Sequence, residues 1–386
     1  MKKILIVSRV GTHPTRMGNN FAILAQVEML KKLGCDVFFL YVQDRGLKAD
    51  AIEDRHKKLQ LMKEYWGDHL FVHHMTIAGK LWSRIYSKTI QRLRKGHLRL
   101  YQNYIYGTAK VVKRLDNKYH FDACIVQYIY QTKIFDYVKF PKMACFTHDT
   151  FAYANLAVSK DLAWYDSHQE AVALQKCTDV MAIQEEEQHY FKVLAPRSNH
   201  YTVFTPYDYH RQPYTGNKNI LFLSGSYRFN VNGLKWFVNE VFPIIKQRHD
   251  DARLLIGGSI CKVAKSMFSD NEGIEFLGYV DDPRVFFGMG DVAINPTYQG
   301  TGLKIKTFEA IANDKVTLVH PHSTNGIFKK DTAPIFASAK ATDWANYIDE
   351  VWGNRELVDS IKKKNELYIR AMNEFIEGEY KRFVEY

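Results

Sequence analysis

Short apolar runs alternate with amphipathic stretches from the first residues of the chain onward. Lys2–Ser8 and Asp36–Val42 are apolar runs that predict strands, and the stretch from about Asn20 to Leu33 between them has helical spacing. Gly34 follows this stretch and predicts the end of the helix. A strand, a helix and a second strand in this order form a βαβ unit, which places two parallel strands in one sheet.

The same pattern continues beyond a long basic stretch. Phe121–Gln127 and Lys142–Thr147 predict buried parallel strands because their apolar runs are nearly continuous. A further strand is expected at Thr178–Ile183, between helices around Lys160–Lys176 and Gln184–Leu194. The first half of the chain therefore predicts one doubly wound α/β domain.

Three acids begin the helix that is expected at Gln184. Glu185, Glu186 and Glu187 lie in its first turn, where negative charge complements the positive end of the helix dipole. We therefore interpret all three as structural residues.

The strand and helix pattern starts again after a linker. Thr205–Asn219 is polar and rich in turn-forming residues, as is typical of a connection between domains. The chain beyond it predicts, in order, a strand at Asn219–Ser224, a loop SGSYRFNVNG, a helix at Leu234–Lys246, strands at Ala252–Gly257, Ile274–Leu277 and Asp291–Asn295, a helix at Leu303–Ala312, a strand at Val316–His320 and a helix from about Glu356 to Tyr386.

These patterns predict an α/β protein with two doubly wound domains. A length of 386 residues suits two domains, and a hydrophobic fraction of 46% supplies their cores. We place the N-terminal domain at 1–208, the second domain at 209–365 and a C-terminal helix at 366–386, which we expect to pack at the domain junction.

The chain shows no pattern of a membrane span or a signal peptide. No apolar run approaches the roughly 18 residues that would cross a bilayer. Met1–Val10 contains only the short apolar run Ile4–Val7, which is too short for a signal peptide. We therefore expect a cytoplasmic protein.

The cysteines predict neither a disulfide framework nor a metal site. They stand at positions 35, 124, 145, 177 and 261, an odd number without C-x-x-C spacing. Cys124 and Cys145 lie within apolar runs, and we expect them to be buried, reduced thiols.

The net charge of +11 is concentrated in one segment. Residues 48–118 contain 16 lysines and arginines against six acids, interleaved with tyrosines, tryptophans and a phenylalanine. This mixture suits the headgroup zone of an anionic membrane, so a peripheral position on the inner face of the cell membrane is one expectation. Nucleic acid would be attracted by the same charge but is the less favoured partner, and a solvated helical face remains the alternative to both.

The stretch DVAINPTYQGTGLKIKTFEAIAN contains the strongest candidate for a ligand site. Its glycines, Gly300 and Gly302, precede a helix whose free N–H groups and dipole favour an anion. Lys304 and Lys306 oppose that dipole unless a negative ligand lies in front of them. The alternative is a solvent-exposed Lys306–Glu309 pair that stabilises the helix by a few tenths of a kcal/mol.

Two other loops carry candidate chemistry. His148 and Asp149 follow a predicted strand, at the sheet edge where open α/β folds keep their sites. His148 would accept a proton or donate a hydrogen bond to a sugar hydroxyl, or else it simply caps the strand. Gly225 and Ser226 form a possible anion nest, and Arg228 beside them suits bidentate phosphate binding.

Taken together, these residues resemble the retaining nucleotide-sugar glycosyltransferases of the GT-B fold, specifically glycosyltransferase family 4 (group 1). TYQGTGLKIKTFEAIAN and ILFLSGSYRFNVNGLKWFVNEVFP carry the resemblance most specifically. THD after a strand, the segment Glu170–Ile183 with its CTDVMAI sequence, and the long loop with Gly11 and Gly18 after the first strand are weaker matches. That loop lacks the G-x-G-x-x-G dinucleotide fingerprint. The matches span nearly the whole chain in family order.

The resemblance implies two Rossmann-like domains facing a central cleft, with the C-terminal helix crossing back to the N-terminal domain. By position it assigns Glu309 to the donor ribose, and Lys304 with the backbone of Gly300, Thr301, Gly302 and Leu303 to the diphosphate. Gly225, Ser226 and Arg228 would line the other side of the donor, Gly18 and Asn19 would lie near the diphosphate and the acceptor, and His148, followed by Asp149, would lie near the transferred sugar. We expect His148, Asp149 and Glu309 to be the catalytic residues.

Two positions depart from the family pattern. Many relatives carry a second glutamate near the donor sugar, eight positions before the residue matching Glu309, where this chain has Thr301. Asn230 stands in the loop where many relatives place a basic residue. Phosphate binding is then expected to depend on Arg228 and Lys304.

The implied activity is transfer, with retention, of a sugar from a nucleotide-diphosphate-sugar donor to a saccharide or lipid-linked saccharide, in cell-surface polysaccharide or glycan synthesis. No cofactor is expected, and no metal is required where basic groups and a helix dipole stabilise the leaving diphosphate. A GT-B-like nucleotide-sugar epimerase is one alternative. A non-catalytic GT-B-like binding protein is the other, and the missing glutamate is its main support.

Overall fold

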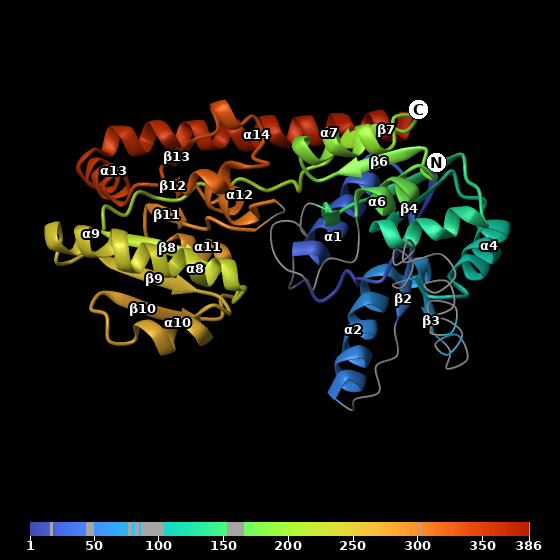
Figure 1. Ribbon diagram of the computed structural model, residues 1–386, viewed down its shortest axis with the longest axis horizontal. Coiled ribbons are helices and arrows are strands. Elements are labelled where there is room, and N and C mark those ends of the chain that lie inside the picture. The colour runs from blue at the N-terminus through green and yellow to red at the C-terminus, as the bar shows by residue number, and fades with distance from the viewer. Residues whose placement is uncertain are drawn as a thin grey trace. The chain divides into compact units, whose positions relative to one another are not determined.

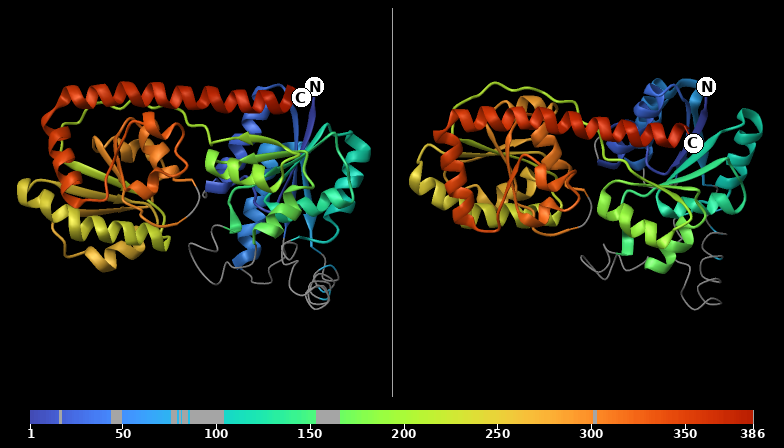
Figure 2. Two further views of the ribbon diagram at one scale, coloured as in Figure 1. Left: turned by 45° about the horizontal axis from the view of Figure 1, so that its top comes forward. Right: turned by 90° about the horizontal axis from the view of Figure 1, so that it is seen from above.

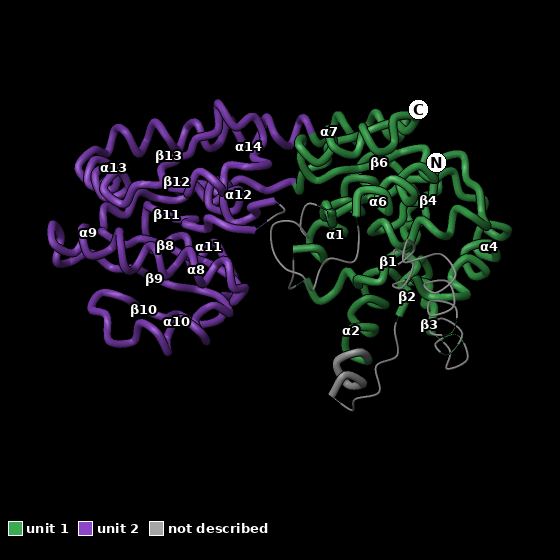
Figure 3. The backbone as a smooth tube through the Cα atoms, in the orientation of Figure 1, with its two compact units in different colours: residues 1–205, 376–386 green, residues 206–375 purple. Residues whose placement is uncertain are grey.

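The computed structural model describes residues 1–15, 18–43, 50–75, 79, 81, 85, 104–152, 166–300 and 303–385, without the side chains of 50–55 (Figure 1). The chain divides into two compact units (Figure 3). Unit 1 comprises Met1–Thr205 and Ile376–Tyr386, and unit 2 comprises Pro206–Phe375. The linker expected at Thr205–Asn219 begins at Thr205, one residue before unit 2 starts at Pro206.

Unit 1 is built on a parallel sheet of seven strands in the order β3-β2-β1-β4-β5-β6-β7. The strands are β1 (Lys3–Ser8), β2 (Asp36–Gln43), β3 (Leu70–His74), β4 (Ala123–Gln127), β5 (Lys142–Phe146), β6 (Asp179–Ala182) and β7 (Asn199–Thr202). The helices are α1 (Gly18–Lys32), α2 (Asp50–Trp66), α4 (Thr108–Tyr119), α6 (Ser167–Leu174) and α7 (Glu185–Leu194), with 3-10 turns at Gly67–His69 and Ile129–Asp136.

Helices cover both faces of this sheet because its strands are apolar on both sides. One set of alternating strand residues, including Leu5, Leu40 and Val126, packs in a core with α4, α6 and α7. On the other face Phe39 stacks on Trp66 of α2, with ring centroids 4.9 Å apart. Burial of strands on both faces is the arrangement expected of an all-parallel sheet.

Unit 2 is built on a parallel sheet of six strands in the order β10-β9-β8-β11-β12-β13. The strands are β8 (Asn219–Leu223), β9 (Arg253–Gly257), β10 (Ile274–Gly278), β11 (Val292–Asn295), β12 (Val316–Val319) and β13 (Ile335–Ala337). The helices are α8 (Arg228–Trp236), α9 (Phe242–Arg248), α10 (Cys261–Phe268), α11 (Pro283–Phe287), α12 (Ile305–Ala312) and α13 (Ala341–Gly353), with a π turn at Phe237–Val241 and 3-10 turns at Pro321–Thr324 and Lys330–Thr332.

The second sheet also has two apolar faces. Ile220, Leu254 and Val292 belong to a core shared with α8, α9, α10 and α13. Their neighbours in sequence, Leu221 and Ala293, face a smaller core formed with α11 and α12. From β8 the chain runs outward through β9 to β10, and it then returns to the other side of β8 and runs outward through β11 and β12 to β13. This is the doubly wound arrangement. The predicted fold class, two Rossmann-like α/β halves, is confirmed.

The last helix, α14 (Arg355–Glu385), is continuous, and its final residues belong to unit 1 (Figure 2). Tyr380 and Phe383 are buried there. Glu379 accepts a hydrogen bond from the backbone N–H of Thr202 at 2.8 Å, and Arg382 donates to the carbonyl of His200 at 2.6 Å. The expectation that the C-terminal helix returns to the N-terminal half is therefore confirmed.

One predicted boundary is wrong. The sequence SGSYRFNVNG was expected to be a loop before a helix at Leu234–Lys246, but α8 begins at Arg228 and the helical stretch continues through a π turn into α9. Gly233 explains part of the difference, because a Cβ at this position would lie 2.8 Å from the carbonyl oxygen of Pro296. The glycine is therefore a point of close approach within a helix and does not mark a loop.

Other differences concern short or edge elements. The strands β3, β7 and β13 and the helices α10, α11 and α13 were not predicted. Much of the basic segment 48–118 lies outside the described residues, as does the first part of the helix expected at 160–176. Within the part of the chain that the structure describes, no helix combines the length and the apolar character needed to cross a bilayer.

Candidate functional site

The start of α12 in unit 2 is joined to the end of β11 by a buried side-chain contact. The Asn295 amide, on the last residue of β11, donates to the Thr307 hydroxyl at 3.0 Å. Lys304 occupies the N-cap position of α12, and its side chain makes no capping hydrogen bond. The first turn of the helix thus opens at the carboxyl end of the sheet, where the sequence predicts an anion site.

The carbonyl oxygen of Gly300 holds the preceding loop in place. It accepts hydrogen bonds from Lys304 Nζ at 3.1 Å and from His322 Nε2 at 2.8 Å. Gly300 has a φ of +95°, and a Cβ there would lie 2.8 Å from the ring of Phe229. The loop therefore needs glycine for both its conformation and its approach to α8. Thr301 and Gly302 lie outside the described residues.

A chain of hydrogen bonds joins the start of α12 to the loop between β8 and α8. Lys306 Nζ donates to Asn230 Oδ1 at 2.9 Å, and Asn230 Nδ2 donates to the carbonyl oxygen of Gly225 at 3.0 Å. The N–H of Ser226 donates to the hydroxyl of Ser259 at 3.1 Å. Two segments that were predicted separately as the two sides of a donor site are therefore neighbours within unit 2.

Charged groups at the start of α12 are poorly solvated. Burial lowers the pKa of Lys304 to about 8. Burial and the charge of Lys304 lower the pKa of Lys306 to about 8, while Glu309 opposes this shift. Burial raises the pKa of Glu309 to about 7, and Lys306 counteracts it. A negative ligand next to the two lysines would offset the cost of burying their charges.

In unit 1, His148 is fixed by a chain of amide side chains. Gln26 Oε1 accepts a hydrogen bond from Gln127 Nε2 at 2.7 Å, which turns Gln127 Oε1 toward His148 Nε2, also at 2.7 Å. His148 Nε2 must therefore carry the proton, and Nδ1 of the neutral ring is an acceptor. Burial lowers the pKa of His148 to about 3.

The surroundings of His148 change the role that the sequence suggests for it. With a pKa of about 3 the ring is a poor proton acceptor at neutral pH, and its Nε2–H is already used. Of the expected roles, a hydrogen bond to a sugar hydroxyl fits better, with Nδ1 as the acceptor of that bond and not its donor. Tyr128 stacks on the ring at 4.3 Å, and Asn19 Nδ2 donates to the Tyr128 hydroxyl at 3.2 Å. Gly18, the first residue of α1, precedes Asn19.

Three carboxyl groups gather behind the loop that carries His148. Glu170 is fully buried and accepts hydrogen bonds from the N–H of Phe151 at 2.7 Å and the hydroxyl of Tyr190 at 2.8 Å. Burial raises the pKa of Asp149 to about 6 and that of Glu170 to about 7. Burial, followed by the charge of Asp149, raises the pKa of Glu187 to about 8.

This cluster corrects the interpretation that all three acids at the start of α7 are structural, and it bears on the role expected of Asp149. Glu185 and Glu186 are exposed, in agreement with a role in complementing the helix dipole, but Glu187 is buried and electrostatically coupled to Asp149. Asp149 itself has a pKa of about 6, so it is mostly ionised at neutral pH. Gln127 and His322 contact candidate site residues and were absent from the predicted site, and no local sequence pattern marks either of them. Lys306 was expected to face a negative ligand but was given no role in the donor site.

The described residues offer no obvious metal centre. Across the described ranges, no group of three or more histidines, cysteines, aspartates and glutamates is arranged to hold a metal ion. All five cysteines are buried free thiols. Cys124 and Cys145 match the expectation drawn from their apolar runs.

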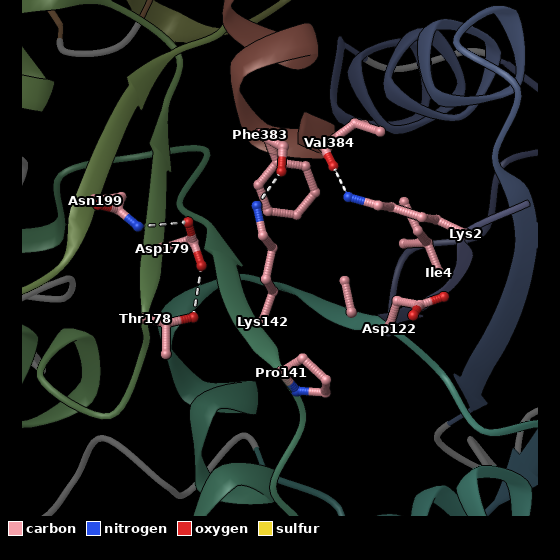
Figure 4. Close-up of a pocket in the computed structure, with 11 residues that line it drawn as sticks. Lys2, Ile4, Asp122, Pro141, Lys142, Thr178, Asp179, Asn199, Phe383 and Val384 are labelled. Carbon is pink, nitrogen blue, oxygen red and sulfur yellow. Dashed lines mark hydrogen bonds between the residues drawn. The ribbon is translucent and has the colours of Figure 1, made fainter. Parts of the chain in front are cut away.

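A cavity in unit 1 lies at the amino-terminal edge of the sheet, opposite the edge that carries His148 (Figure 4). It has a volume of about 250 Å³ and is lined by residues before or at the start of β1, β4, β5, β6 and β7 and by the end of α14. Lys2 and Lys142 donate hydrogen bonds to the carbonyl oxygens of Val384 and Phe383. These lysines satisfy the last carbonyls of α14, so we interpret the cavity as part of the attachment of that helix.

A comparison with known families identifies the central part of unit 2. Residues 217–354, from β8 through α13, match the family of glycosyl transferases group 1. This part of the chain is similar to the group 1 glycosyl transferases. The match contains Gly225, Lys306 and Glu309 and thus both segments joined by the Lys306–Asn230 contact.

Solved structures extend the similarity beyond this domain. TarM superimposes with a TM-score of 0.67 at 11% identity, covering 100% of this chain and 98% of that chain. The pneumococcal O-GlcNAc transferase GtfA, solved in complex with UDP and GlcNAc, superimposes with a TM-score of 0.64 at 10% identity, covering 100% of this chain and 98% of that chain. At such low identity the similarity establishes the fold alone, which is GT-B.

A curated relative of this chain comes from Klebsiella pneumoniae. It is an uncharacterized 44.6 kDa protein in the cps region and is 27% identical over 124 residues. The alignment covers 30% of this chain and 32% of the relative, so the chain spans about a third of that protein.

Proposed function

We propose that the protein is a retaining glycosyltransferase of family 4, which transfers a sugar from a nucleoside diphosphate sugar to a saccharide or lipid-linked saccharide. The match of residues 217–354 to the group 1 glycosyl transferases supports glycosyl transfer as the general activity. UDP in the GtfA structure, and in that of an S. aureus TarM mutant, supports a nucleotide-sugar donor. The cps region that holds the Klebsiella relative supports a role in cell-surface polysaccharide synthesis.

The observation that carries the proposal is the set of charged groups at the start of α12. Lys304, Lys306 and Glu309 lie within two turns of one helix, beside the glycine loop and the loop after β8. In the proposed complex the Glu309 carboxylate accepts hydrogen bonds from the ribose hydroxyls. Lys304 and the backbone of Gly300 and Leu303 hold the diphosphate, whose charge grows as the sugar leaves.

Unit 1 is proposed to supply the residues that act on the sugar and the acceptor. His148 would accept a hydrogen bond from a hydroxyl of the transferred sugar at Nδ1. Asp149 would contribute negative charge next to it, and Gly18 with Asn19 would contact the diphosphate and the acceptor. We propose no metal in this reaction, because the lysines and the helix dipole provide the positive charge that the leaving diphosphate needs.

A thermal-shift panel followed by product analysis tests the proposal. UDP, GDP, ADP and TDP, and their common sugar derivatives, are added to the full-length protein, because a ligand bound only by the native state raises its melting temperature. The donor that binds best is then incubated with acceptor saccharides, and the anomeric configuration of the product is read by NMR. Transfer with the donor's configuration supports the proposal, and an inverted product contradicts retention.

The same assay separates the other activities of this fold. A new sugar isomer formed without any acceptor would indicate a nucleotide-sugar epimerase. Binding of a donor with neither transfer nor isomerisation would indicate a non-catalytic binding protein. Liposome flotation with anionic vesicles, compared with duplex DNA over a salt series, would show which partner the basic segment 48–118 prefers.

A further inference from the structure

The position of Lys306 adds a residue to the proposed donor site. The resemblance assigns the diphosphate to Arg228 and Lys304. In the structure the Arg228 guanidinium lies over the ring of Phe229, 4.9 Å from its centroid, and Lys304 Nζ lies 3.1 Å from the carbonyl oxygen of Gly300. Both of these cations therefore also have contacts within the protein.

Lys306 differs because its ammonium group reaches from one predicted segment of the site to the other. The residue belongs to the first turn of α12, and its Nζ lies 2.9 Å from Asn230 Oδ1 in the first turn of α8. Asn230 also donates to the carbonyl oxygen of Gly225, at the loop after β8. The ammonium group is therefore placed among backbone and side chains from the starts of two helices.

The hydrogen bond to Asn230 does not by itself explain why a lysine occupies position 306. An amide oxygen is neutral, and one hydrogen bond uses only one of the three ammonium protons. Lys306 is only partly exposed, and Lys304 on the same turn repels it. Both effects disfavour its charged form, which is an arrangement typical of a site that an anion completes.

We propose that Lys306 binds the diphosphate of the donor directly and that Asn230 orients its ammonium group at the start of α8. The inference rests on the proposed function and deepens it. It assigns the cation beside the β8–α8 loop to α12, because the first turn of α8 carries the neutral Asn230 at the point of contact. The two positions should then be interchangeable, since either one would place a lysine ammonium group in the same space.

A charge swap tests this inference. Binding of inorganic pyrophosphate, and of UDP, GDP, ADP and TDP, is measured by calorimetry for the wild type, Lys306→Gln and the double variant Lys306→Asn with Asn230→Lys. Loss of one charged hydrogen bond predicts that Lys306→Gln binds pyrophosphate and the preferred nucleoside diphosphate about 10- to 100-fold more weakly. The double variant should recover most of that affinity. Lys235→Gln, an exposed lysine of α8, is the matched control and should leave affinity unchanged.

The outcomes separate this inference from the proposed function. The melting temperature of each unliganded variant and its affinity for the corresponding nucleoside show whether the fold and the base contacts persist. If the wild type binds a nucleoside diphosphate and Lys306→Gln binds it equally well, the inference is wrong and the proposed function stands. A folded double variant that stays as weak as Lys306→Gln contradicts the role of Asn230. If the wild type binds neither pyrophosphate nor any nucleoside diphosphate, the proposed function fails and the inference with it.

Discussion

His148 Nε2 lies 2.7 Å from Gln127 Oε1, and this hydrogen bond fixes the tautomer of the histidine, while burial keeps the ring neutral. Gln26 determines which atom Gln127 presents, because it accepts a bond from the Gln127 amide nitrogen. The ring is held neutral with Nδ1 as its remaining acceptor. Its contribution to the proposed reaction is therefore a hydrogen bond, and proton transfer at neutral pH is not expected of it.

Gln127→Glu should change the charge of His148. A carboxylate next to Nε2 favours the imidazolium form, so the histidine pKa should rise by about 2 units or more from its value of about 3. Histidine NMR titration measures this shift. Gln175→Glu, at an exposed position, is the control and should leave the His148 signals unchanged. A His148 pKa that does not move in Gln127→Glu would show that Gln127 does not control the ring.

Replacement of His148 should separate turnover from donor binding. His148→Ala removes the proposed hydrogen bond to the transferred sugar but leaves the α12 groups in unit 2 unchanged. We expect kcat to fall about 10- to 100-fold while the affinity for the nucleoside diphosphate changes by less than about twofold. Steady-state kinetics and calorimetry on the same preparation test this. Normal turnover in the variant would remove His148 from the mechanism.

Glu187→Gln should make stability less sensitive to alkaline pH. The pKa of Glu187 is about 8 in the folded protein, above the ordinary value of 4.5, so the fold favours the protonated carboxyl group. The contribution of this group to stability is therefore fully present below pH 4.5, and that contribution is lost as the pH rises through 8. Glutamine imitates the protonated form and avoids the loss.

The free energy of unfolding of Glu187→Gln should differ little from that of the wild type at pH 5. At pH 8.5 the variant should be more stable by on the order of 1–3 kcal/mol, measured by denaturant unfolding. Glu185→Gln on the exposed side of the same turn is the control, and its effect should not depend on pH in this range. Equal pH dependence of the Glu187→Gln variant and the wild type would contradict the burial of an acid at this position.

Two helical glycines should respond oppositely to alanine. A Cβ at Gly233 in α8 would lie 2.8 Å from the Pro296 carbonyl oxygen, which is backbone and cannot easily move. Gly233→Ala should therefore destabilise unit 2 by about 1–3 kcal/mol. Gly378 in α14 has open space around the corresponding position, so Gly378→Ala should stabilise by about 0.5–1 kcal/mol. Thermal unfolding checks both, and a tolerated alanine at 233 would contradict the close approach.

Donor affinity should depend on pH with a maximum between about 7 and 8. The proposed complex needs Glu309 ionised and Lys304 and Lys306 protonated. Affinity should rise as the pH passes the Glu309 pKa of about 7 and fall above the lysine pKa values of about 8. In Glu309→Gln the rise on the acidic side should disappear and the alkaline fall should remain. An unchanged acidic limb would separate Glu309 from the ligand.

Local sequence patterns were sufficient for much of the fold. The strand at Asp291–Asn295 and the helix at Leu303–Ala312 could be predicted because each depends on neighbours in sequence, and β11 and α12 lie within one or two residues of the expected places. The start of α8 was missed because the residues FNVNG that follow Arg228 are individually poor helix formers. Tertiary contacts with the loop after β11 decide their conformation instead, as the Gly233 approach shows.

The candidate site needed contacts that no local pattern contains. Lys306 and Asn230 are 76 positions apart, and Gln26 and Gln127 are 101 positions apart. Glu187 appeared to be one of three equivalent acids because all three complement the dipole of α7, but only the packing against the loop with Asp149 distinguishes it. Prediction of such coupling requires the sheet order, which places the ends of distant strands side by side.

The central claim is that the start of α12 binds the diphosphate and ribose of a nucleotide donor. Calorimetric titration of the wild type, Lys304→Ala and Glu309→Ala with the nucleoside diphosphate that gives the largest thermal shift tests it most directly. Glu272→Ala, an exposed acid of unit 2, serves as the control. The claim predicts saturable binding to the wild type and the control, and a loss of about tenfold or more in each of the other two variants. Affinity unchanged in both Lys304→Ala and Glu309→Ala would contradict it.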